Sequence, residues 1–336
     1  MSHWPLFDAC PALADQLAPR ALCDLPTPVQ PLPAAGQVAW IKRDDLTHPQ
    51  YGGNKMRKLE FVAAELQARH VRRVYTFGAT GTNAGVAAAL LCRELGIHCT
   101  VFTFDQPDSP TVRKNQSLMK HYGAELVHTG ALWRTALTWY MHPRRLDPRS
   151  YFLFAGCSNP VATFGYVNAA FELRAQVSLG ECPMPAEIVV AAGSAATLAG
   201  LTLGCALAGL PTRVVGVRVA PAKVGPFDAC TAGVTRKMMA QALATLAAAD
   251  STFTGVHVPD VDLRDDWYGD GYGVPTLAGD AATRIAASDG IPLEPTYSAK
   301  AFAAFLDRLA SVNGPVLFWN TYSSRALPEA LTGVRA

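Results

Sequence analysis

The sequence lacks an excess of charge of either sign. Lys and Arg together number 29 and Asp and Glu 27, so the formal net charge is +2 over 336 residues. A charge that small creates no field strong enough to attract a nucleic acid or an acidic membrane surface. We therefore expect no nucleic acid and no membrane as a partner. A small-molecule substrate fits this composition better.

Cysteine spacing that would indicate a metal centre or a redox pair is also missing. The eight cysteines are scattered, without a C-x-x-C pair, at positions 10, 23, 92, 99, 157, 182, 205 and 230. Several of them lie inside apolar segments, where a free thiol behaves as a small hydrophobe. The run MSHWPLFDAC carries no basic stretch followed by an apolar one, so no secretory signal is visible. We expect no metal and a cytoplasmic, reducing environment.

Low-complexity tracts and internal repeats are absent, and the pattern that remains is that of an α/β protein. Hydrophobic residues make up 50% and charged residues 17%, which is typical of a well-packed globular chain. The length of 336 residues suits two α/β domains better than one core. Apolar, β-branched strands alternate with Ala- and Leu-rich helices, which predicts βαβ units and a parallel sheet. We predict strands at 73–77, 99–104, 125–128, 151–154, 188–191, 214–219 and 316–319. We predict helices at 55–68, 83–95, 111–122, 161–177, 198–208, 235–248, 278–288 and 300–310.

One uncharged segment, residues 188–210, is long enough to cross a bilayer. Its character changes midway, because the β-branched residues end at Gly193-Ser194 and an Ala- and Leu-rich stretch begins at Thr197. The preceding residues PMPAE also lack the basic charge that flanks membrane helices. We therefore predict a buried strand, a tight turn and a buried helix in place of a membrane span.

Two loops rich in small residues follow predicted strands. The first runs from Gly78 to Gly85 and the second from Gly193 to Thr197. Ligands gather at the carboxyl ends of parallel strands, and the free amides at a helix start bind anions such as phosphate or carboxylate. Two such loops predict a ligand set with two anionic groups.

A lysine in the run GGNKMRKLE supplies a third element. Gly52 and Gly53 favour a helix entry and Asn54 can cap the helix after it, so Lys55 is expected in the first helical turn. A lysine that is partly desolvated near the positive end of a helix has a lowered pKa, and its neutral amine can form an imine with a carbonyl. Taken alone, this lysine fits better as a solvated member of a basic patch with its neighbours.

The run IKRDDLTHPQYGGNKMRKLEF resembles the 1-aminocyclopropane-1-carboxylate deaminase and D-cysteine desulfhydrase family of pyridoxal phosphate enzymes. The resemblance extends from about Trp40 to Ser324, with the motifs in the family's order. It implies the two-domain, open twisted parallel-sheet fold of the tryptophan synthase β-like type, fold type II, with pyridoxal 5'-phosphate in the cleft between the domains. It also implies a large domain of residues 1–58 plus 166–336, a small domain of residues 59–165, and a homodimer.

The same resemblance assigns roles to individual residues. Lys55 is implied as the lysine that carries the cofactor, and Lys58 as a contact of the phosphate. TGTNAG resembles the loop in which Asn83 meets the phenolic oxygen of the cofactor and Thr82, with the amides of Asn83, Ala84 and Gly85, faces the substrate carboxylate. GSAATLAGL resembles the phosphate cradle, which carries phosphate binding to Gly193, Ser194, Ala195, Ala196 and Thr197. DGYGVP and EPTYSAKAF imply two tyrosines near the substrate, Tyr272 and Tyr297.

Departures from the family motifs bear on the reaction. Ala84 stands for a His or Gln, Ala195, Ala196 and Ala299 stand for glycines, and residues 320–324 (NTYSS) stand for H-T-G-G. The deaminase subgroup has Glu directly after the tyrosine that is Tyr297 here, whereas this chain has Ser298. Ser298 or Thr321 would then face the pyridine nitrogen and leave the ring neutral. A neutral ring stabilises a carbanion less, which favours substrates with a good β-leaving group.

We therefore expect a pyridoxal phosphate-dependent lyase that performs α,β-elimination on a β-substituted alanine, giving pyruvate and ammonia, in the manner of D-cysteine desulfhydrase. Opening of 1-aminocyclopropane-1-carboxylate and β-replacement are the alternatives within the family. Outside it, glycines after a strand with Asp105 further on give the outline of a nicotinamide site, although the G-x-G-x-x-G spacing is missing. A non-catalytic binding protein on the same fold is a further alternative, against which the retention of Lys55 argues.

Overall fold

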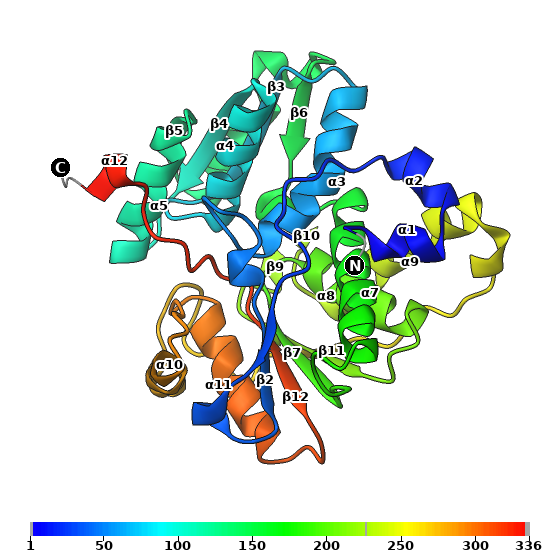
Figure 1. Ribbon diagram of the computed structural model, residues 1–336. Coiled ribbons are helices and arrows are strands. Elements are labelled where there is room, and N and C mark those ends of the chain that lie inside the picture. The colour runs from blue at the N-terminus through cyan, green and yellow to red at the C-terminus, as the bar shows by residue number, and fades with distance from the viewer. Residues whose placement is uncertain (1–2, 226, 333–336) are drawn as a thin grey trace.

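The computed structural model describes residues 3–225 and 227–332, which form two lobes, each with a parallel or largely parallel sheet (Figure 1). One lobe is built on a six-stranded sheet and the other on a four-stranded sheet. A small hairpin of two further strands, β9 (Lys223–Val224) and β10 (Phe227–Asp228), lies apart from both sheets.

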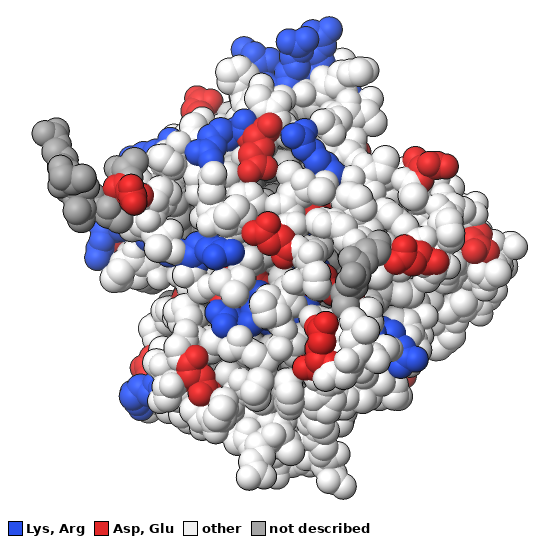
Figure 2. Space-filling model, viewed as in Figure 1, with Lys and Arg blue, Asp and Glu red and all other residues white. Residues whose placement is uncertain are grey.

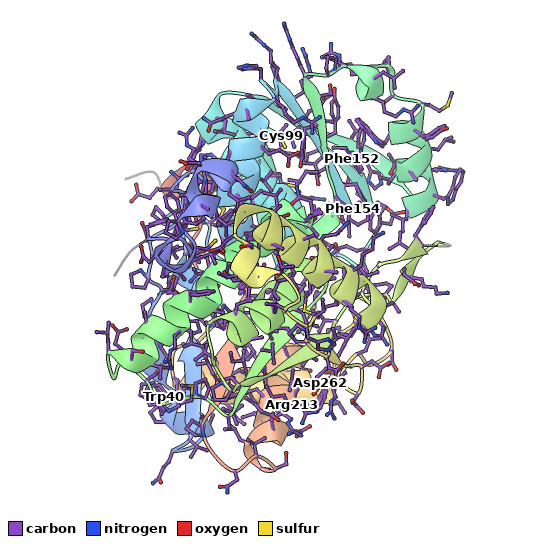
Figure 3. All side chains as sticks on the ribbon, turned by 90° about the vertical axis from the view of Figure 1, so that its right-hand side faces the viewer. Trp40, Cys99, Phe152, Phe154, Arg213 and Asp262 are labelled. Atoms are coloured by element: carbon purple, nitrogen blue, oxygen red, sulfur yellow. The ribbon has the colours of Figure 1, made fainter. Side chains whose placement is uncertain are left out.

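The six-stranded sheet has the order β1-β2-β12-β7-β8-β11, and only the pairing of β1 with β2 is antiparallel. Its strands are β1 (Val29–Pro31), β2 (Ala39–Lys42), β12 (Val316–Trp319), β7 (Glu187–Ala192), β8 (Arg213–Arg218) and β11 (Asp262–Arg264). Side chains of β7 alternate between two cores, with Ile188 and Val190 in one and Val189 in the other. Such a strand is buried on both faces, which explains its unbroken apolar sequence. At the far edge, Arg213 of β8 and Asp262 of β11 form an ion pair of 2.5 Å (Figure 3).

Helices cover both faces of this sheet. The first face packs against α7 (Phe164–Ser178) and α8 (Ala195–Leu207), and the second against α10 (Leu277–Ser288) and α11 (Ser298–Leu309). Outside α7 and α8 lie α1 (Pro5–Ala9), α2 (Ala12–Leu17) and α9 (Ala232–Ala249), joined to them by a separate apolar cluster. This arrangement is the doubly wound α/β architecture that the alternating sequence pattern predicts.

The four-stranded sheet has the order β5-β4-β3-β6 and is parallel throughout. Its strands are β3 (Arg73–Ala79), β4 (His98–Phe104), β5 (Glu125–Gly130) and β6 (Ser150–Leu153). The helices of this lobe are α3 (Asn54–Ala68), α4 (Asn83–Leu95), α5 (Pro110–His121) and α6 (Leu132–Tyr140), and the short α12 (Glu329–Thr332) lies near it (Figure 1). The four strands fall inside the predicted small domain of residues 59–165 and the strands of the larger sheet fall outside it. The exact domain boundary stays a prediction.

A buried ionic cluster anchors α3 to the larger lobe. Arg57 of α3 donates to Asp44 and to Glu172 of α7 at 2.7–2.9 Å, and Lys42 of β2 donates to the same glutamate at 2.5 Å. All four side chains are at most 1% exposed, so two positive and two negative charges compensate each other away from water. Because Arg57 lies two residues after Lys55, the cluster fixes the start of α3 relative to the six-stranded sheet.

The uncharged segment and the cysteines take the places that composition predicts. Residues 188–210 form β7, a turn and α8, and within the described residues no helix is both long and apolar enough to span a membrane. The cysteines are free and buried, as expected of small hydrophobes. Within the same residues, no His, Cys, Asp and Glu side chains gather in a group that could hold a metal ion. Basic and acidic side chains are interspersed on the face shown in Figure 2.

Candidate active site

A cavity of about 270 Å³ lies between the two lobes, where the carboxyl ends of strands from both sheets approach each other. Its walls come from the start of α3, the end of β3 with the start of α4, the loop between β7 and α8, the β9–β10 hairpin, and the segments before α11 and after β12. This is the place where parallel sheets bind ligands. The two small-residue loops singled out in the sequence therefore meet at one site.

Lys55 enters the cavity from the first turn of α3. The helix begins at Asn54, directly after Gly53. Gly53 has a φ of +96°, and an added Cβ would lie 2.8 Å from the carbonyl oxygen of Thr321, so this position requires glycine. Asn54 does not cap the helix as expected, because its side-chain amide donates to Thr197 instead, at 3.0 Å. The Lys55 amine lies 5.8 Å from the ring centre of Tyr297. Burial lowers the pKa of Lys55, which favours the neutral, nucleophilic amine.

Lys58 lies one turn further along α3 and is fully buried. Its amine donates to the carbonyl of Gly156 at 3.2 Å. Burial and the positive charge of Lys55 lower the pKa of Lys58 to about 7. A cation that is disfavoured in this way is stabilised by an anion beside it, so the site is suited to a phosphate group.

The loop after β7 presents free amides to the same region. Gly193 and Ser194 line the cavity, and α8 begins directly afterwards with Ala195, Ala196 and Thr197. Ser194 is the N-cap residue, but its hydroxyl pairs with Ser158 at 2.7 Å and does not cap the helix. The amides of the first turn are consequently left for a ligand. Ala195 and Ala196 are buried and do not line the cavity, so the methyl groups that replace two motif glycines do not narrow it.

The loop before α4 forms the opposite wall. The Thr82 hydroxyl caps α4 by accepting from Gly85 N at 3.3 Å, so the amide of Gly85 is already bonded. The Oδ1 of Asn83 accepts from the Tyr51 hydroxyl at 2.9 Å and from the Asn115 side-chain amide at 2.7 Å. Because both bonds go to the oxygen, the side-chain NH2 group of Asn83 is the part that can donate to a ligand. Thr82, Asn83 and Ala84 line the cavity, whereas Gly85 packs behind it.

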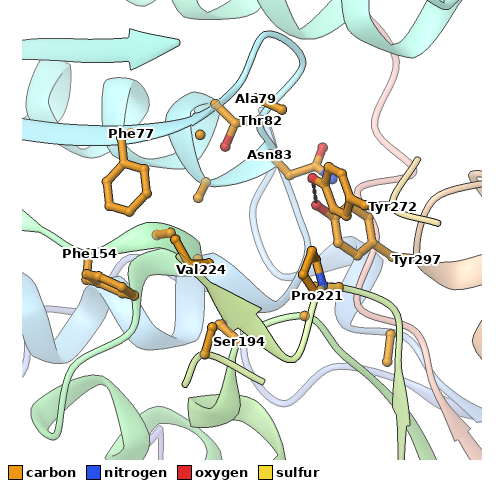
Figure 4. A pocket seen from close by; sticks show the side chains of 18 of the residues that line it. Phe77, Ala79, Thr82, Asn83, Phe154, Ser194, Pro221, Val224, Tyr272 and Tyr297 are labelled. Carbon is orange, nitrogen blue, oxygen red and sulfur yellow. Dashed lines mark hydrogen bonds between the residues drawn. The ribbon is translucent and has the colours of Figure 1, made fainter. Parts of the chain in front are cut away.

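Tyr272 and Tyr297 face the cavity with their hydroxyls hydrogen-bonded to each other (Figure 4). Burial raises the pKa of both phenols, and the neighbouring Tyr272 raises that of Tyr297 further. Both hydroxyls therefore remain protonated and can donate. A Cβ at Gly193 would lie 3.1 Å from the Tyr297 ring, so the glycine allows this ring its position.

The two residues expected near the pyridine nitrogen occupy different places. Thr321 lines the cavity just after β12, and its carbonyl accepts from Asn54 N at the start of α3. Ser298 is fully buried behind the wall, where its hydroxyl bonds to the backbone of Glu294. Its role at the nitrogen stays a prediction that its position does not favour.

Glu294 is a cavity residue that the sequence reasoning missed. Its carboxylate accepts from the backbone N–H groups of Thr296, Tyr297 and Ser298 at 2.6–2.9 Å, and so holds the start of α11. Burial raises its pKa, whereas these hydrogen bonds and the charge of Lys55 oppose that shift. An acidic residue just before a predicted helix was the available signal, because such residues often bond the free amides of a first turn.

Comparison with known proteins agrees with this geometry. The family model described as "Pyridoxal-phosphate dependent enzyme" matches residues 21–321. This chain belongs to the pyridoxal-phosphate dependent enzyme family. The D-cysteine desulfhydrase of Salmonella schwarzengrund (strain CVM19633) is 32% identical over 323 residues, covering 91% of this chain and 94% of that protein. A solved structure of a 1-aminocyclopropane-1-carboxylate (ACC) deaminase homologue is 28% identical, with a TM-score of 0.80 over 96% of both chains. A pyridoxal 5'-phosphate-dependent aspartate racemase shares the fold, with a TM-score of 0.63 at 16% identity over 89% of this chain and 91% of that one.

The cavity of this pyridoxal-phosphate dependent enzyme fits its cofactor. Lys55 lines the cavity and offers an amine of lowered pKa for the covalent link. Lys58, one turn further along α3 and behind the cavity wall, holds a buried amine whose charged form an anion would stabilise. The first-turn amides of α8, which no side chain caps, would provide the second half of a phosphate site. When bound, the cofactor supplies the electron-withdrawing group that lets a proton leave the α-carbon of an amino acid. The fold and cofactor expected from the sequence are thereby confirmed, and the nicotinamide alternative is not supported.

Proposed function

We propose that this enzyme eliminates the β-substituent of a small D-amino acid, releasing pyruvate and ammonia. The observation that carries the proposal is a lysine of lowered pKa set between two anion-binding helix starts. Support for the D-configuration comes from the similarity to D-cysteine desulfhydrase over 91% of the chain.

Each part of the site has a task in this reaction. The substrate carboxylate binds at the start of α4, among Thr82, Asn83 and Ala84. The Lys55 amine removes the α-proton, the bond between Cβ and the leaving atom breaks, and the leaving atom departs with the electron pair. The paired hydroxyls of Tyr272 and Tyr297 supply a proton to that atom. Water then hydrolyses the enamine product, through its imine tautomer, to pyruvate and ammonia.

The test is a panel of amino acids with the purified holoenzyme, with pyruvate, 2-oxobutanoate and sulfide measured in parallel. We expect pyruvate from D-cysteine and β-chloro-D-alanine, much less from the L-enantiomers, and little 2-oxobutanoate from 1-aminocyclopropane-1-carboxylate. Faster opening of the cyclopropane than any β-elimination would overturn the proposal in favour of the deaminase reaction. That reaction is the second candidate because of the structural similarity to the ACC deaminase homologue. Added thiols that divert pyruvate into new amino acids would instead indicate β-replacement.

The assignment of Lys55 is tested separately. Borohydride reduction of the holoenzyme followed by peptide mapping is expected to place the cofactor on Lys55, and Lys55→Ala is expected to abolish both the label and turnover. Lys237→Ala serves as the control, because it removes an exposed lysine of α9, away from the cavity, and should leave the label on Lys55. A label on another lysine of the wild-type enzyme would contradict the assignment.

We also propose that the enzyme works as a homodimer in the cytoplasm. The resemblance to the deaminase and desulfhydrase family supports the dimer, and the free cysteines favour a reducing compartment. Sedimentation of the holoenzyme at micromolar concentration is expected to give twice the chain mass, and a monomer would contradict the dimer.

A further inference from the structure

The cavity has a second end that the proposed reaction does not use. Phe77, Phe154 and Val224 line this end, which we name the apolar chamber; Phe104 and Leu132 are further apolar residues of the same cavity. Figure 4 shows Phe77, Phe154 and Val224 on one side of the cavity and Asn83, Tyr272 and Tyr297 on the other. The cavity thus divides into a polar part that handles the amino acid and an apolar part beside it.

The aromatic wall of the chamber is a packed unit. The Phe77 and Phe154 rings meet edge to face, with centroids 5.4 Å apart, and Phe77 stacks on Phe152 at 5.7 Å from behind. Phe152 does not line the cavity, whereas Phe154 does and is 48% exposed. Figure 3 shows Phe152 and Phe154 close together in the smaller lobe. An aromatic surface kept half in contact with solvent has an unfavourable free energy that an apolar ligand would relieve.

The chamber is continuous with the site for the substrate carboxylate. Phe77 is followed at the end of β3 by Gly78, where an added Cβ would lie 2.5 Å from the Thr82 hydroxyl. Thr82 in turn caps α4 and belongs to the proposed carboxylate site. A substrate held there by its carboxylate and amine can therefore extend its side chain into the chamber. Lys223, which precedes Val224 in β9, also lines the cavity and is exposed.

Hydrogen sulfide and chloride would gain nothing from such a wall, because they carry no apolar surface. We infer that the natural leaving group is an apolar thiol and that the enzyme cleaves S-alkyl or S-aralkyl conjugates of cysteine. This inference rests on the proposed β-elimination and names its substrate class. Lys55 removes the α-proton, the Cβ–S bond breaks, and the sulfur leaves with the electron pair and takes a proton to give an apolar thiol. Water then hydrolyses the remaining enamine, through its imine tautomer, to pyruvate and ammonia. No oxidant or reductant is required.

The first experiment compares S-benzyl-D-cysteine with S-methyl-D-cysteine. We expect kcat/KM to be about ten to a hundred times higher for the benzyl compound, the range that binding of additional apolar groups gives in enzyme pockets. Phe77→Ala should lower the ratio of the two values at least about tenfold. Phe152→Ala is the matched control, because it removes a ring of the same stack that does not line the cavity and should leave the ratio unchanged.

The second experiment measures binding without a leaving group. In the analogue D-2-amino-5-phenylpentanoate a CH2 group replaces the sulfur, and D-norvaline is the short reference. Spectral titration of the holoenzyme should give a dissociation constant at least about tenfold lower for the phenyl analogue, and Phe77→Ala should remove the difference. Equal binding of the two analogues, or an equal effect of Phe77→Ala and Phe152→Ala, would overturn the inference.

The two experiments separate failure of the inference from failure of the proposed function. If β-chloro-D-alanine yields pyruvate but the benzyl conjugate reacts no better than the methyl one, the chamber has another use and the β-elimination stands. If no β-substituted alanine of either configuration yields pyruvate, the proposed function falls. The inference that the leaving group is an apolar thiol is then refuted as well.

Discussion

We predict that the buried amine of Lys58 makes cofactor binding depend on pH. Its pKa is lowered to about 7 by burial and by Lys55, compared with an ordinary value of about 10.4 for lysine. A phosphate beside it stabilises the charged form and raises the pKa again. The free protein therefore holds half a proton at this amine near pH 7 and almost none at pH 9, whereas the complex holds a full proton at both.

This difference converts into affinity by linkage. The protonated fraction of Lys58 in the free protein falls from about one half at pH 7 to about one hundredth at pH 9, so the dissociation constant should rise about fiftyfold, or about 2.3 kcal/mol. At pH 8, binding should take up about 0.9 protons at this group. In the protein without cofactor, the effect of Lys58 on folding stability changes with pH in the opposite direction to that of a cation whose pKa is raised by folding. A folded pKa below the unfolded one means that stability rises as the pH increases from 7 towards 10.

The assay uses 4-deoxypyridoxine 5'-phosphate, which has the phosphate and ring of the cofactor but no aldehyde to react with Lys55. Isothermal titration calorimetry of the apoprotein at pH 7, 8 and 9, in buffers of different ionisation enthalpy, gives both the affinity and the protons taken up. Lys58→Gln should flatten the pH dependence and remove the uptake, whereas Lys237→Gln, on the exposed face of α9, should change neither. Ionisation of the ligand is the same in all three proteins and cancels in the comparison. An identical slope for the wild type and Lys58→Gln would refute the reasoning.

Three further predictions concern the cradle, the buried cluster and the ring nitrogen. Thr197→Val should weaken cofactor binding about tenfold to a hundredfold, as expected for one charge-assisted hydrogen bond, whereas Thr202→Val, on the same helix with a hydroxyl that has no partner among the described residues, should not. Glu172→Gln removes the anion that pairs with the buried cations Lys42 and Arg57. It should lower the free energy of unfolding in urea by about 3–5 kcal/mol and leave the m-value unchanged. A loss of less than about 1 kcal/mol would contradict the burial argument. Nuclear magnetic resonance of ring-15N cofactor should show a neutral nitrogen, because Thr321 lines the cavity while the Glu294 carboxylate is bonded to three backbone N–H groups. A protonated nitrogen that becomes neutral in Glu294→Gln would assign that place to the glutamate.

The helices and strands that sequence reasoning found are those whose residues carry a local signal. The change from β-branched to Ala- and Leu-rich sequence after residue 193 correctly separates β7 from α8, although α8 starts at Ala195, three residues before the predicted start. Strand β2 was missed because it ends in Lys42, which reads as a surface residue. Its burial depends on Glu172 and Gln176, more than 120 positions away in the chain, and no local pattern contains that information.

The candidate site divides in the same way. Residues whose role follows from a helix start, such as Lys55 and the loop from Thr82, could be placed from the sequence because the free amides and the lysine belong to one short segment. Ser298 was expected near the pyridine nitrogen and Glu294 was not considered, because no local pattern shows that Ser298 is buried while Glu294 borders the cavity. In the structure Ser298, the first helical residue, is fully buried, while the carboxylate of Glu294, four positions earlier, accepts from backbone N–H groups that follow it and borders the cavity. The polarity of the cavity wall before α11 thus depends on how this segment packs in the folded protein. The protonation of the ring nitrogen therefore requires a measurement on the folded holoenzyme.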